Sequence, residues 1–308
     1  MRKAVYKLML CLILAIALFA CTVSVSAMEP VDTERPASLT LQYRRGEECF
    51  EGLTVKTYRI ADVYADGTFQ LCGAFRDYPI SIYGITTAAE WKTVAATLDA
   101  YTAGDAIAPD LAAETDSEGK VAFEDISAGM YLTLGIRVEN EGVVTIFETF
   151  LTVIPQTTEE GHNYDITAYP KCSIYEPTPD EVEYKVIKQW KDGGNDDKRP
   201  EFIEIDILCD GEKVRQEKLS TENDWSYSWS APDNGAKWQA VERNVPDGYT
   251  VTVSEKGSTI VVTNSYEGNA EKPPQTGDSF VILHYVIPMA VSGAVILILA
   301  VCRRRKEA

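Results

Sequence analysis

Residues 183–190 read "EYKVIKQW", a short run in which polar and apolar side chains alternate. Successive side chains of a β-strand point to opposite faces, so Lys188 shares a face with Val186 and Trp190. That face is apolar apart from the lysine. The stretch therefore predicts a β-domain that carries a charged group among its inward-facing side chains.

Two later strands of the same region show the same feature. In "WQAVER" (238–243), alternation places Glu242 on the face of Trp238. In "TIVVTNSY" (259–266), it places Asn264 on a face of aliphatic side chains. Burying one such group alone would cost on the order of several kcal/mol, so we expect the lysine, the glutamate and the asparagine to meet. The alternative is a surface lysine, an outward glutamate and a capping asparagine.

A meeting of these three groups has a defined chemistry. A buried lysine tends to lose its proton, and a buried glutamate tends to gain one. A neutral amine beside a carboxamide, polarised by a carboxylic acid, is arranged to form an amide with loss of ammonia. The product is an uncharged cross-link, which removes most of the cost of burial.

This region resembles the collagen-adhesin B-type (Cna B-type) domain, in which an isopeptide bond joins a first-strand lysine to a last-strand asparagine. The segments that carry the resemblance are "KQW", "DKRPEFIEIDIL", "VERNVPDGY" and "VTNSY". It covers residues 183–267, whose length and strand density suit a small β-sandwich. The resemblance implies that Lys188 and Asn264 are linked and that Glu242 is the catalytic acid. By analogy with a disulfide, a loop of 76 positions would constrain the unfolded chain by about 4–5 kcal/mol.

Upstream, residues 28–172 also show strand-like alternation, for example in "SLTLQY" (38–43). Asp66-Gly67 lies between two strand-like runs and predicts a tight hairpin. This region has no lysine in its first strand, and Lys56 lies in an ambiguous strand, so a second isopeptide bond is left open here. The segment 173–182, "SIYEPTPDEV", reads as a linker to the B-type region.

One helix is expected in the first region. Thr87 and Glu90 form a capping box, and Gly104 provides a stop signal. An apolar stripe predicts packing against a sheet, and it consists of Trp91, Val94, Ala95, Leu98 and Tyr101. We therefore predict a mainly β protein of two tandem Ig-like, Cna B-type sandwich domains, the first with an inserted helix.

The first region ends in "NYDITAYPKCS", where alternation leaves Lys171 exposed. The plain reading is a solvated surface lysine. The order of "DSEGKVAFEDISAGMYL", "FETFLTVIP" and "YDITAYPK" resembles the N-terminal domain of Gram-positive pilin subunits. The resemblance implies that Tyr169, Pro170 and Lys171 form the pilin motif, whose lysine accepts the threonine of the next subunit. "VERNVPDGY" is likewise similar to the glutamate box of that family, centred on Glu242.

The C-terminal segment, 268–308, has three parts. Residues 280–302 carry no formal charge over 23 positions, enough to cross a bilayer as a helix, with a buried soluble helix as the alternative. A basic tail, 303–308, follows. With the pentad before them they resemble a sortase sorting signal, whose pattern is Leu-Pro-x-Thr-Gly. The resemblance implies cleavage after the threonine of the pentad Pro273, Pro274, Gln275, Thr276 and Gly277. Pro273 in place of leucine leaves the sortase class open.

The N-terminal segment, 1–27, reads as a signal peptide. It has a basic start, an apolar middle and small residues at Val25 and Ala27, which fit a cleavage site before Met28. A lipoprotein cleavage box at Leu18 to Cys21 is the alternative.

Composition narrows the class of function. The expected exported region, residues 28–276, holds 22 basic and 45 acidic residues, a net charge of −23. Such a surface argues against nucleic acid or an anionic membrane as partner. His162 is the one histidine of that region, so a His-based triad or multi-His metal site has little support, and we predict no metal or cofactor. Cys49 and Cys72 are candidates for a bridge, with free thiols as the alternative.

The sequence as a whole predicts a secreted structural protein of the cell surface, with no enzymatic activity beyond its own cross-link. The resemblances imply a sortase-polymerised pilus subunit used in adhesion, in which Thr276 of one copy joins Lys171 of the next. Sortase, sister subunits and peptidoglycan are the expected partners. The alternative is a monomeric, peptidoglycan-anchored adhesin in which Lys171 is unused. A receptor cannot be named, and a backbone, minor or basal role is left open.

Overall fold

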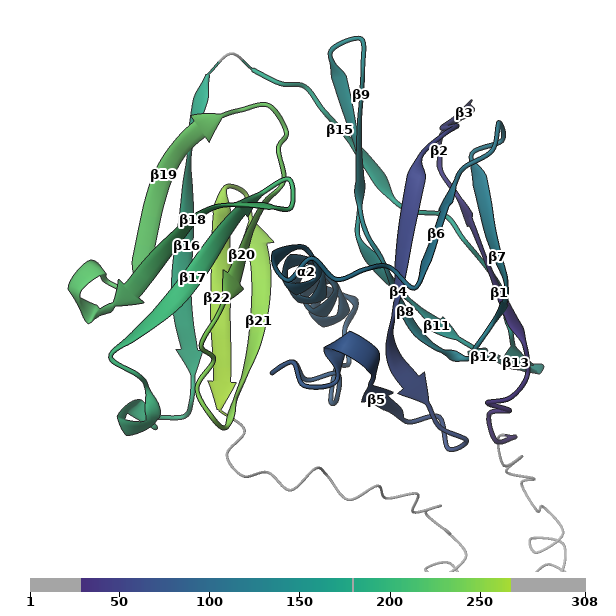
Figure 1. The fold of residues 1–308 in the computed structure, drawn as a ribbon, viewed down its shortest axis with the longest axis horizontal. Coiled ribbons are helices and arrows are strands. Elements are labelled where there is room, and N and C mark those ends of the chain that lie inside the picture. Colours follow the sequence, from purple (N-terminus) through teal and green to yellow (C-terminus); the bar gives the residue numbers. More distant parts are fainter. Residues whose placement is uncertain (1–28, 179, 267–308) are drawn as a thin grey trace, which may run out of the picture.

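The computed structural model describes residues 29–178 and 180–266, which form two β domains with one helix between them (Figure 1). The predicted mainly β fold with an inserted helix is confirmed. The predicted signal peptide, the predicted sorting pentad, the apolar span and the basic tail lie outside the described residues. Among the described residues, none of the helices has the length and apolarity needed to cross a membrane.

The first domain contains three main sheets, with strand orders β14-β1-β7, β15-β10-β9 and β11-β8-β4-β5, and β6 paired to β4. Two short pairs, β2-β3 and β12-β13, complete it. The bounds of its strands are β1 Ala37–Gln42, β2 Arg44–Arg45, β3 Glu48–Cys49, β4 Thr54–Val63, β5 Phe69–Leu71, β6 Leu111–Glu114, β7 Lys120–Ile126, β8 Gly129–Thr133, β9 Ile136–Asn140, β10 Val143–Phe147, β11 Phe150–Ile154, β12 Gln156–Thr158, β13 Gly161–Asn163, β14 Asp165–Ala168 and β15 Cys172–Tyr175.

Alternation explains why these residues form this domain. In β1, Leu39 and Leu41 are fully buried while the residues between them are half-buried, so one face meets the core. The predicted hairpin joins β4 to β5, with Val63 paired to Phe69. Gly67 has a φ of +80°, the left-handed conformation that such a tight turn requires and that glycine adopts without strain.

The second domain is a sandwich of two sheets, with orders β19-β16-β22-β21 and β18-β17-β20. Its strands are β16 Glu181–Lys191, β17 Phe202–Cys209, β18 Glu212–Ser220, β19 Ser226–Pro232, β20 Trp238–Glu242, β21 Tyr249–Lys256 and β22 Thr259–Tyr266. The first strand, β16, and the last, β22, are parallel neighbours, with Lys188 opposite Val262. The strand that enters the domain and the strand that leaves it therefore lie side by side.

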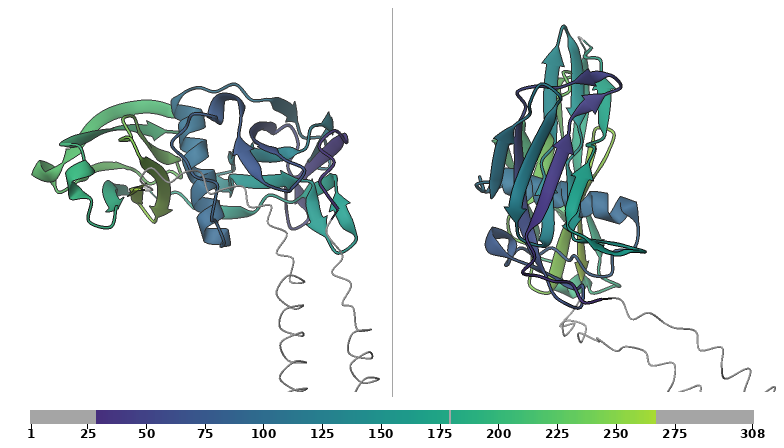
Figure 2. Two further views of the ribbon diagram at one scale, coloured as in Figure 1. Left: turned by 90° about the horizontal axis from the view of Figure 1, so that it is seen from below. Right: turned by 90° about the vertical axis from the view of Figure 1, so that its right-hand side faces the viewer.

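Helix α2 (Ala88–Gly104) starts at the predicted capping box. The Thr87 hydroxyl accepts a hydrogen bond from the Glu90 backbone N–H (3.2 Å), and the Glu90 carboxylate accepts one from the Thr87 N–H (2.9 Å). The predicted apolar stripe packs into a core shared with β8 of the first domain, but that same core also contains β17, β20 and β21 of the second. Helix α2 therefore lies at the junction of the two domains and packs against both of them (Figure 2).

The first domain provides hydrogen-bond acceptors for backbone N–H groups at one edge of the second domain. The Val253 N–H donates to the hydroxyl of Thr97, a fully buried residue of α2 (2.7 Å). The Val251 N–H donates to the carbonyl of Pro79 in the same way (2.7 Å). Because β21 is an edge strand of its sheet, these bonds satisfy groups that would otherwise face solvent or another chain.

The segment between the domains is shorter than the linker expected at 173–182. Residues 172–175 form β15, which pairs antiparallel with β10 of the first domain. The next strand, β16, begins at Glu181. The first proline of the segment is Pro177, so no proline interrupts the backbone hydrogen bonds of residues 172–175.

The candidate bridge between Cys49 and Cys72 is not formed. Cys49 is exposed on β3, while the buried Cys72 donates its thiol to the Arg59 carbonyl (3.6 Å). Cys172 and Cys209 are also free thiols. The described residues therefore depend on packing and hydrogen bonds for their stability, without a disulfide.

Candidate functional site

Lys188, Glu242 and Asn264 meet inside the second domain, from three separate strands. Lys188 lies on β16, Glu242 ends β20 and Asn264 lies on β22, and they are 4%, 1% and 0% exposed. The Lys188 Nζ lies 3.5 Å from Glu242 Oε2. The Asn264 Nδ2 donates to Glu242 Oε1 at 2.8 Å. The structure therefore brings together the three side chains that the sequence places on apolar faces.

Aromatic rings enclose the lysine end of this site. The Nζ lies 4.1 Å from the centre of the Trp190 ring, a cation–π distance. Trp190 in turn packs edge-on against Trp225 and Tyr249, with ring centres 5.3 and 5.4 Å apart. The amine also donates to the Gln189 carbonyl (3.1 Å). These neighbours keep water from the amine while leaving it close to the carboxyl group.

Burial shifts both titrating groups toward their uncharged forms. It lowers the pKa of Lys188 to about 8, even though the nearby Glu242 opposes that shift. Burial also raises the pKa of Glu242, against the opposing effect of Lys188 and the Asn264 hydrogen bond. Burial therefore favours a neutral amine beside a protonated acid.

The geometry fits a proton shuttle between two nitrogens. One carboxyl oxygen of Glu242 contacts the amide nitrogen of Asn264, and the other faces the amine of Lys188. Attack of Nζ on the Asn264 Cγ would form the new C–N bond and break the bond to Nδ2. The carboxyl group could take a proton from the attacking nitrogen and return one to the departing ammonia, so that Glu242 ends unchanged.

Two buried oxygens of this site lack a hydrogen-bond partner, Glu242 Oε2 and Asn264 Oδ1. Such orphaned polar atoms are uncommon in folded proteins, and a catalytic role is one of the explanations for them. Both atoms belong to the groups that would rearrange on forming the bond.

A second polar cluster closes the loop beside Trp190, and the sequence did not reveal it. Asp192 accepts two hydrogen bonds from the Arg199 guanidinium, at 2.6 and 2.9 Å. Arg199 also lies 5.7 Å from the Trp190 ring centre. The stretch 192–199 is thus held by an ion pair. In the described part of the chain, no group of acidic, cysteine or histidine side chains could hold a metal.

This ion pair predicts an acid-sensitive contribution to stability. Hydrogen bonds from Arg199 lower the pKa of Asp192 to about 2, below its unfolded value of about 3.9. The stabilisation is therefore present above about pH 4 and is lost as the pH falls through about 2. We expect Asp192→Asn to lower the thermal midpoint at pH 7 and the difference from wild type to vanish near pH 2. Asp197→Asn is the control because its side chain is 74% exposed, and an equal loss there would contradict the assignment.

The predicted pilin motif at the domain boundary carries an exposed lysine, as a reaction with another molecule would require. Tyr169 is 61% exposed and Lys171 is exposed, whereas Pro170 between them is buried. The Lys171 carbonyl accepts a hydrogen bond from the Glu148 N–H (2.9 Å), which fixes the backbone under the side chain.

Lys56, the other lysine considered for an isopeptide bond, is exposed on β4 with no buried acid beside it in the part that the structure describes. Lys188 is the one buried lysine among the described residues.

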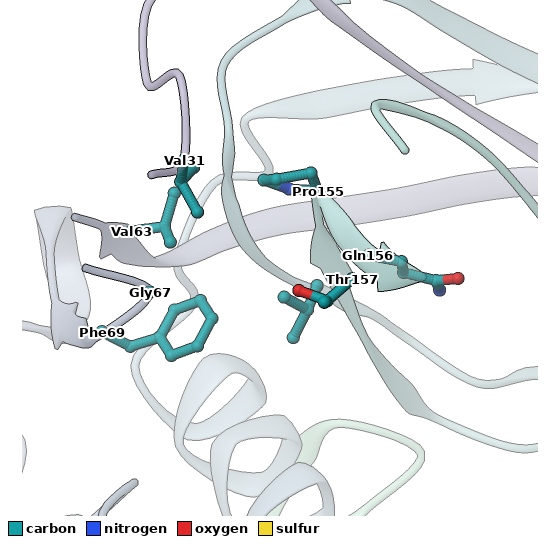
Figure 3. Close-up of a pocket in the computed structure, with 8 residues that line it drawn as sticks. Val31, Val63, Gly67, Phe69, Pro155, Gln156 and Thr157 are labelled. Atoms are coloured by element: carbon teal, nitrogen blue, oxygen red, sulfur yellow. The ribbon is translucent and has the colours of Figure 1, made fainter. Parts of the chain in front are cut away.

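The first domain contains a hollow of about 360 Å³ (Figure 3). It is lined mainly by apolar side chains, with Gln156 and Thr157 as its polar members. None of its lining residues titrates near neutral pH, so it offers no catalytic group.

Comparison with known proteins shows which domain family the second domain resembles. Residues 184–265 match the Cna protein B-type domain. The collagen adhesin of Staphylococcus aureus is 32% identical over 105 residues, which are 32% of this chain and 9% of the adhesin. The match therefore spans part of this chain and a small part of that relative.

Solved structures are similar at lower identity. The major pilin SpaD of Corynebacterium diphtheriae is 15% identical, with 77% of this chain and 99% of that chain covered and a TM-score of 0.28. The T6 backbone pilin of Streptococcus pyogenes is 14% identical, with coverage of 78% and 64% and a TM-score of 0.33. These scores are too low to establish a common arrangement of the whole chains. The matched residues coincide with the sandwich whose first and last strands are neighbours, and the second domain of this chain is a Cna protein B-type domain.

Proposed function

We propose that this protein is a structural protein of the bacterial cell surface whose second domain closes an isopeptide bond between Lys188 and Asn264. The observation that carries the proposal is the buried trio, with the Glu242 carboxyl between the amine and the amide. The proposal gives a reason for burying three polar groups that would otherwise destabilise the domain. Glu242 serves only this internal reaction, so the protein turns over no substrate.

The position of the bond supports a mechanical role. The chain enters the domain on β16 and leaves it on β22, and these strands are parallel neighbours. A pull on the two ends would shear this pair. A covalent link from Lys188 to Asn264 carries the tension directly between them, and the residues in between are not unfolded by it.

The same proposal extends to assembly. A sortase would cut after Thr276 and transfer its carbonyl to Lys171 of a sister copy, making a covalent pilus, with the last subunit joined to peptidoglycan. The exposure of Lys171 and Tyr169 supports this acceptor role. The alternative is a monomeric wall-anchored adhesin, in which Thr276 is joined to peptidoglycan alone. The 32% identity of part of the chain to a collagen adhesin favours that alternative.

The mass of the purified exported region, residues 28–276, tests the internal bond. We expect an intact mass lower than the sequence mass by one ammonia, about 17 Da, because the Asn264 amide nitrogen is released. Glu242→Gln keeps the shape of the side chain but removes the acid, so it should retain the full sequence mass. A wild-type protein of unchanged mass would contradict the proposal.

A further inference from the structure

The strand that carries Glu242 is held from outside its own sheet. β20 is the edge strand of the order β18-β17-β20, so one of its two backbone edges has no strand beside it. The Arg243 N–H donates to the Glu204 carbonyl (2.9 Å), which makes Glu242 and Ile205 a non-hydrogen-bonded pair of the ladder. The carbonyl of Glu242 therefore points away from β17, toward the open edge.

A tyrosine of the first domain occupies that edge. The Tyr101 hydroxyl, on helix α2, donates to the Glu242 carbonyl at 2.8 Å in a buried contact. Tyr101 is 4% exposed, and its ring packs at 4.9 Å on that of Tyr78. Burial raises its pKa further above neutrality, so the hydroxyl stays protonated and remains a donor. The two residues also line one hollow of about 460 Å³ at the domain junction.

Helix α2 also holds the residues on either side of Glu242. Near the start of β20, Gln239 donates its amide to the Asp99 carboxylate (3.0 Å), and both residues are 3% exposed. Just beyond its end, Arg243 donates to the carbonyl of Gly104 (2.9 Å) and pairs with Asp105. The helix thus holds β20 before, at and after the reactive residue.

The site is sensitive to small movements of this strand. Glu242 contacts the amide of Asn264 at 2.8 Å but is still 3.5 Å from the amine of Lys188, which is long for a hydrogen bond. A shift of a few tenths of an ångström in β20 would change both distances. Because reaction between held groups depends steeply on their separation, the position of the strand sets the rate.

We propose that helix α2 is a positioning element for isopeptide formation, with Tyr101 as its central residue, so that the bond closes efficiently only after the first domain has docked. The inference rests on the proposed function, since it assigns a control to the same site. Tyr101 touches no reacting atom, and it acts through the backbone of Glu242. The first domain would then act as an internal scaffold that delays the irreversible bond until both domains are folded.

Timed formation of the bond in the two-domain chain tests this. Residues 28–276 would be made by a short pulse of cell-free translation, quenched in denaturant at intervals and digested. Mass spectrometry then measures the ratio of the linked Lys188–Asn264 peptide to the unlinked peptides. We expect Tyr101→Phe to slow closure roughly tenfold or more, because it removes one hydroxyl and leaves the packing of the ring.

Tyr131→Phe is the matched control. Its hydroxyl also donates to a backbone carbonyl, that of Ser127 (2.6 Å), but within the first domain. It should close at the wild-type rate, and its rate should keep the wild-type dependence on pH. Tyr101→Phe should shift that dependence, because a moved β20 changes the spacing of Lys188 and Glu242.

Gln239→Leu provides a second variant in case Tyr101→Phe does not fold. It removes another contact between β20 and α2, and we expect slower closure there too. Wild-type rates in both folded variants, or equal slowing in Tyr131→Phe, would overturn the inference and leave the proposed function standing. Absence of the linked peptide in the wild type would overturn both.

Discussion

Asn264→Ala is expected to lower the thermal midpoint of the second domain by about 20 °C or more. Loss of the bond returns about 4–5 kcal/mol of chain entropy to the unfolded state, estimated from the disulfide analogy for a 76-position loop. For a domain of this size, each kcal/mol corresponds to about 4–8 °C. The variant also leaves Lys188 and Glu242 buried and removes the amide that donates a hydrogen bond to the Glu242 carboxyl group, which adds to the loss.

Two further variants separate the bond from the packing. Glu242→Gln leaves Lys188 and Asn264 in place and prevents closure, so most of its loss in midpoint reports the missing bond. Asn244→Ala removes an exposed asparagine of the same domain, whose amide donates to Glu204 (3.2 Å). Its thermal midpoint should stay close to that of the wild type. Calorimetry or circular dichroism gives the midpoints. Midpoints of Asn264→Ala and Glu242→Gln within a few degrees of wild type would show that no bond stabilises the domain.

Lys171→Arg is expected to abolish every covalent species above the monomer in cells that carry the cognate sortases. Arginine keeps the positive charge, but its guanidinium stays protonated and is a poor nucleophile. The surrounding fold should be unaffected because the side chain is exposed and the supporting bond uses the backbone carbonyl. The readout is the ladder of bands on a denaturing gel of cell-wall extracts.

Lys56→Arg is the matched control, since Lys56 is an exposed lysine on β4 of the same domain. It should leave the ladder intact. A ladder that survives Lys171→Arg would assign the acceptor to another lysine. A single wild-type band would favour the monomeric wall-anchored adhesin, without bearing on the internal bond. The two predictions therefore test assembly and internal cross-linking separately.

The candidate site was largely readable from the sequence, because it depends on short-range alternation. Period two alone placed Lys188, Glu242 and Asn264 on apolar faces, and each is buried in the structure. The capping box at Thr87 likewise predicted the start of α2 at Ala88. In each case a few neighbouring residues carry the information.

The surroundings of helix α2 were not readable in this way. Its apolar stripe indicated one covered face, yet Thr97, Asp99 and Thr102 on the same helix are also buried. Polar residues at these positions look like a solvated face in a sequence. They are buried because the second domain supplies partners such as Val253 and Gln239, more than a hundred positions away.

The sequence by itself determined a mainly β chain, a second β region with three polar residues facing inward, and an exposed lysine at the boundary. These features follow from the local pattern of side chains along strands. Only the tertiary structure decided that α2 joins the two domains and that Tyr101 holds the carbonyl of Glu242, 141 positions away. Such a contact depends on how two distant surfaces fit, and no local pattern contains that information.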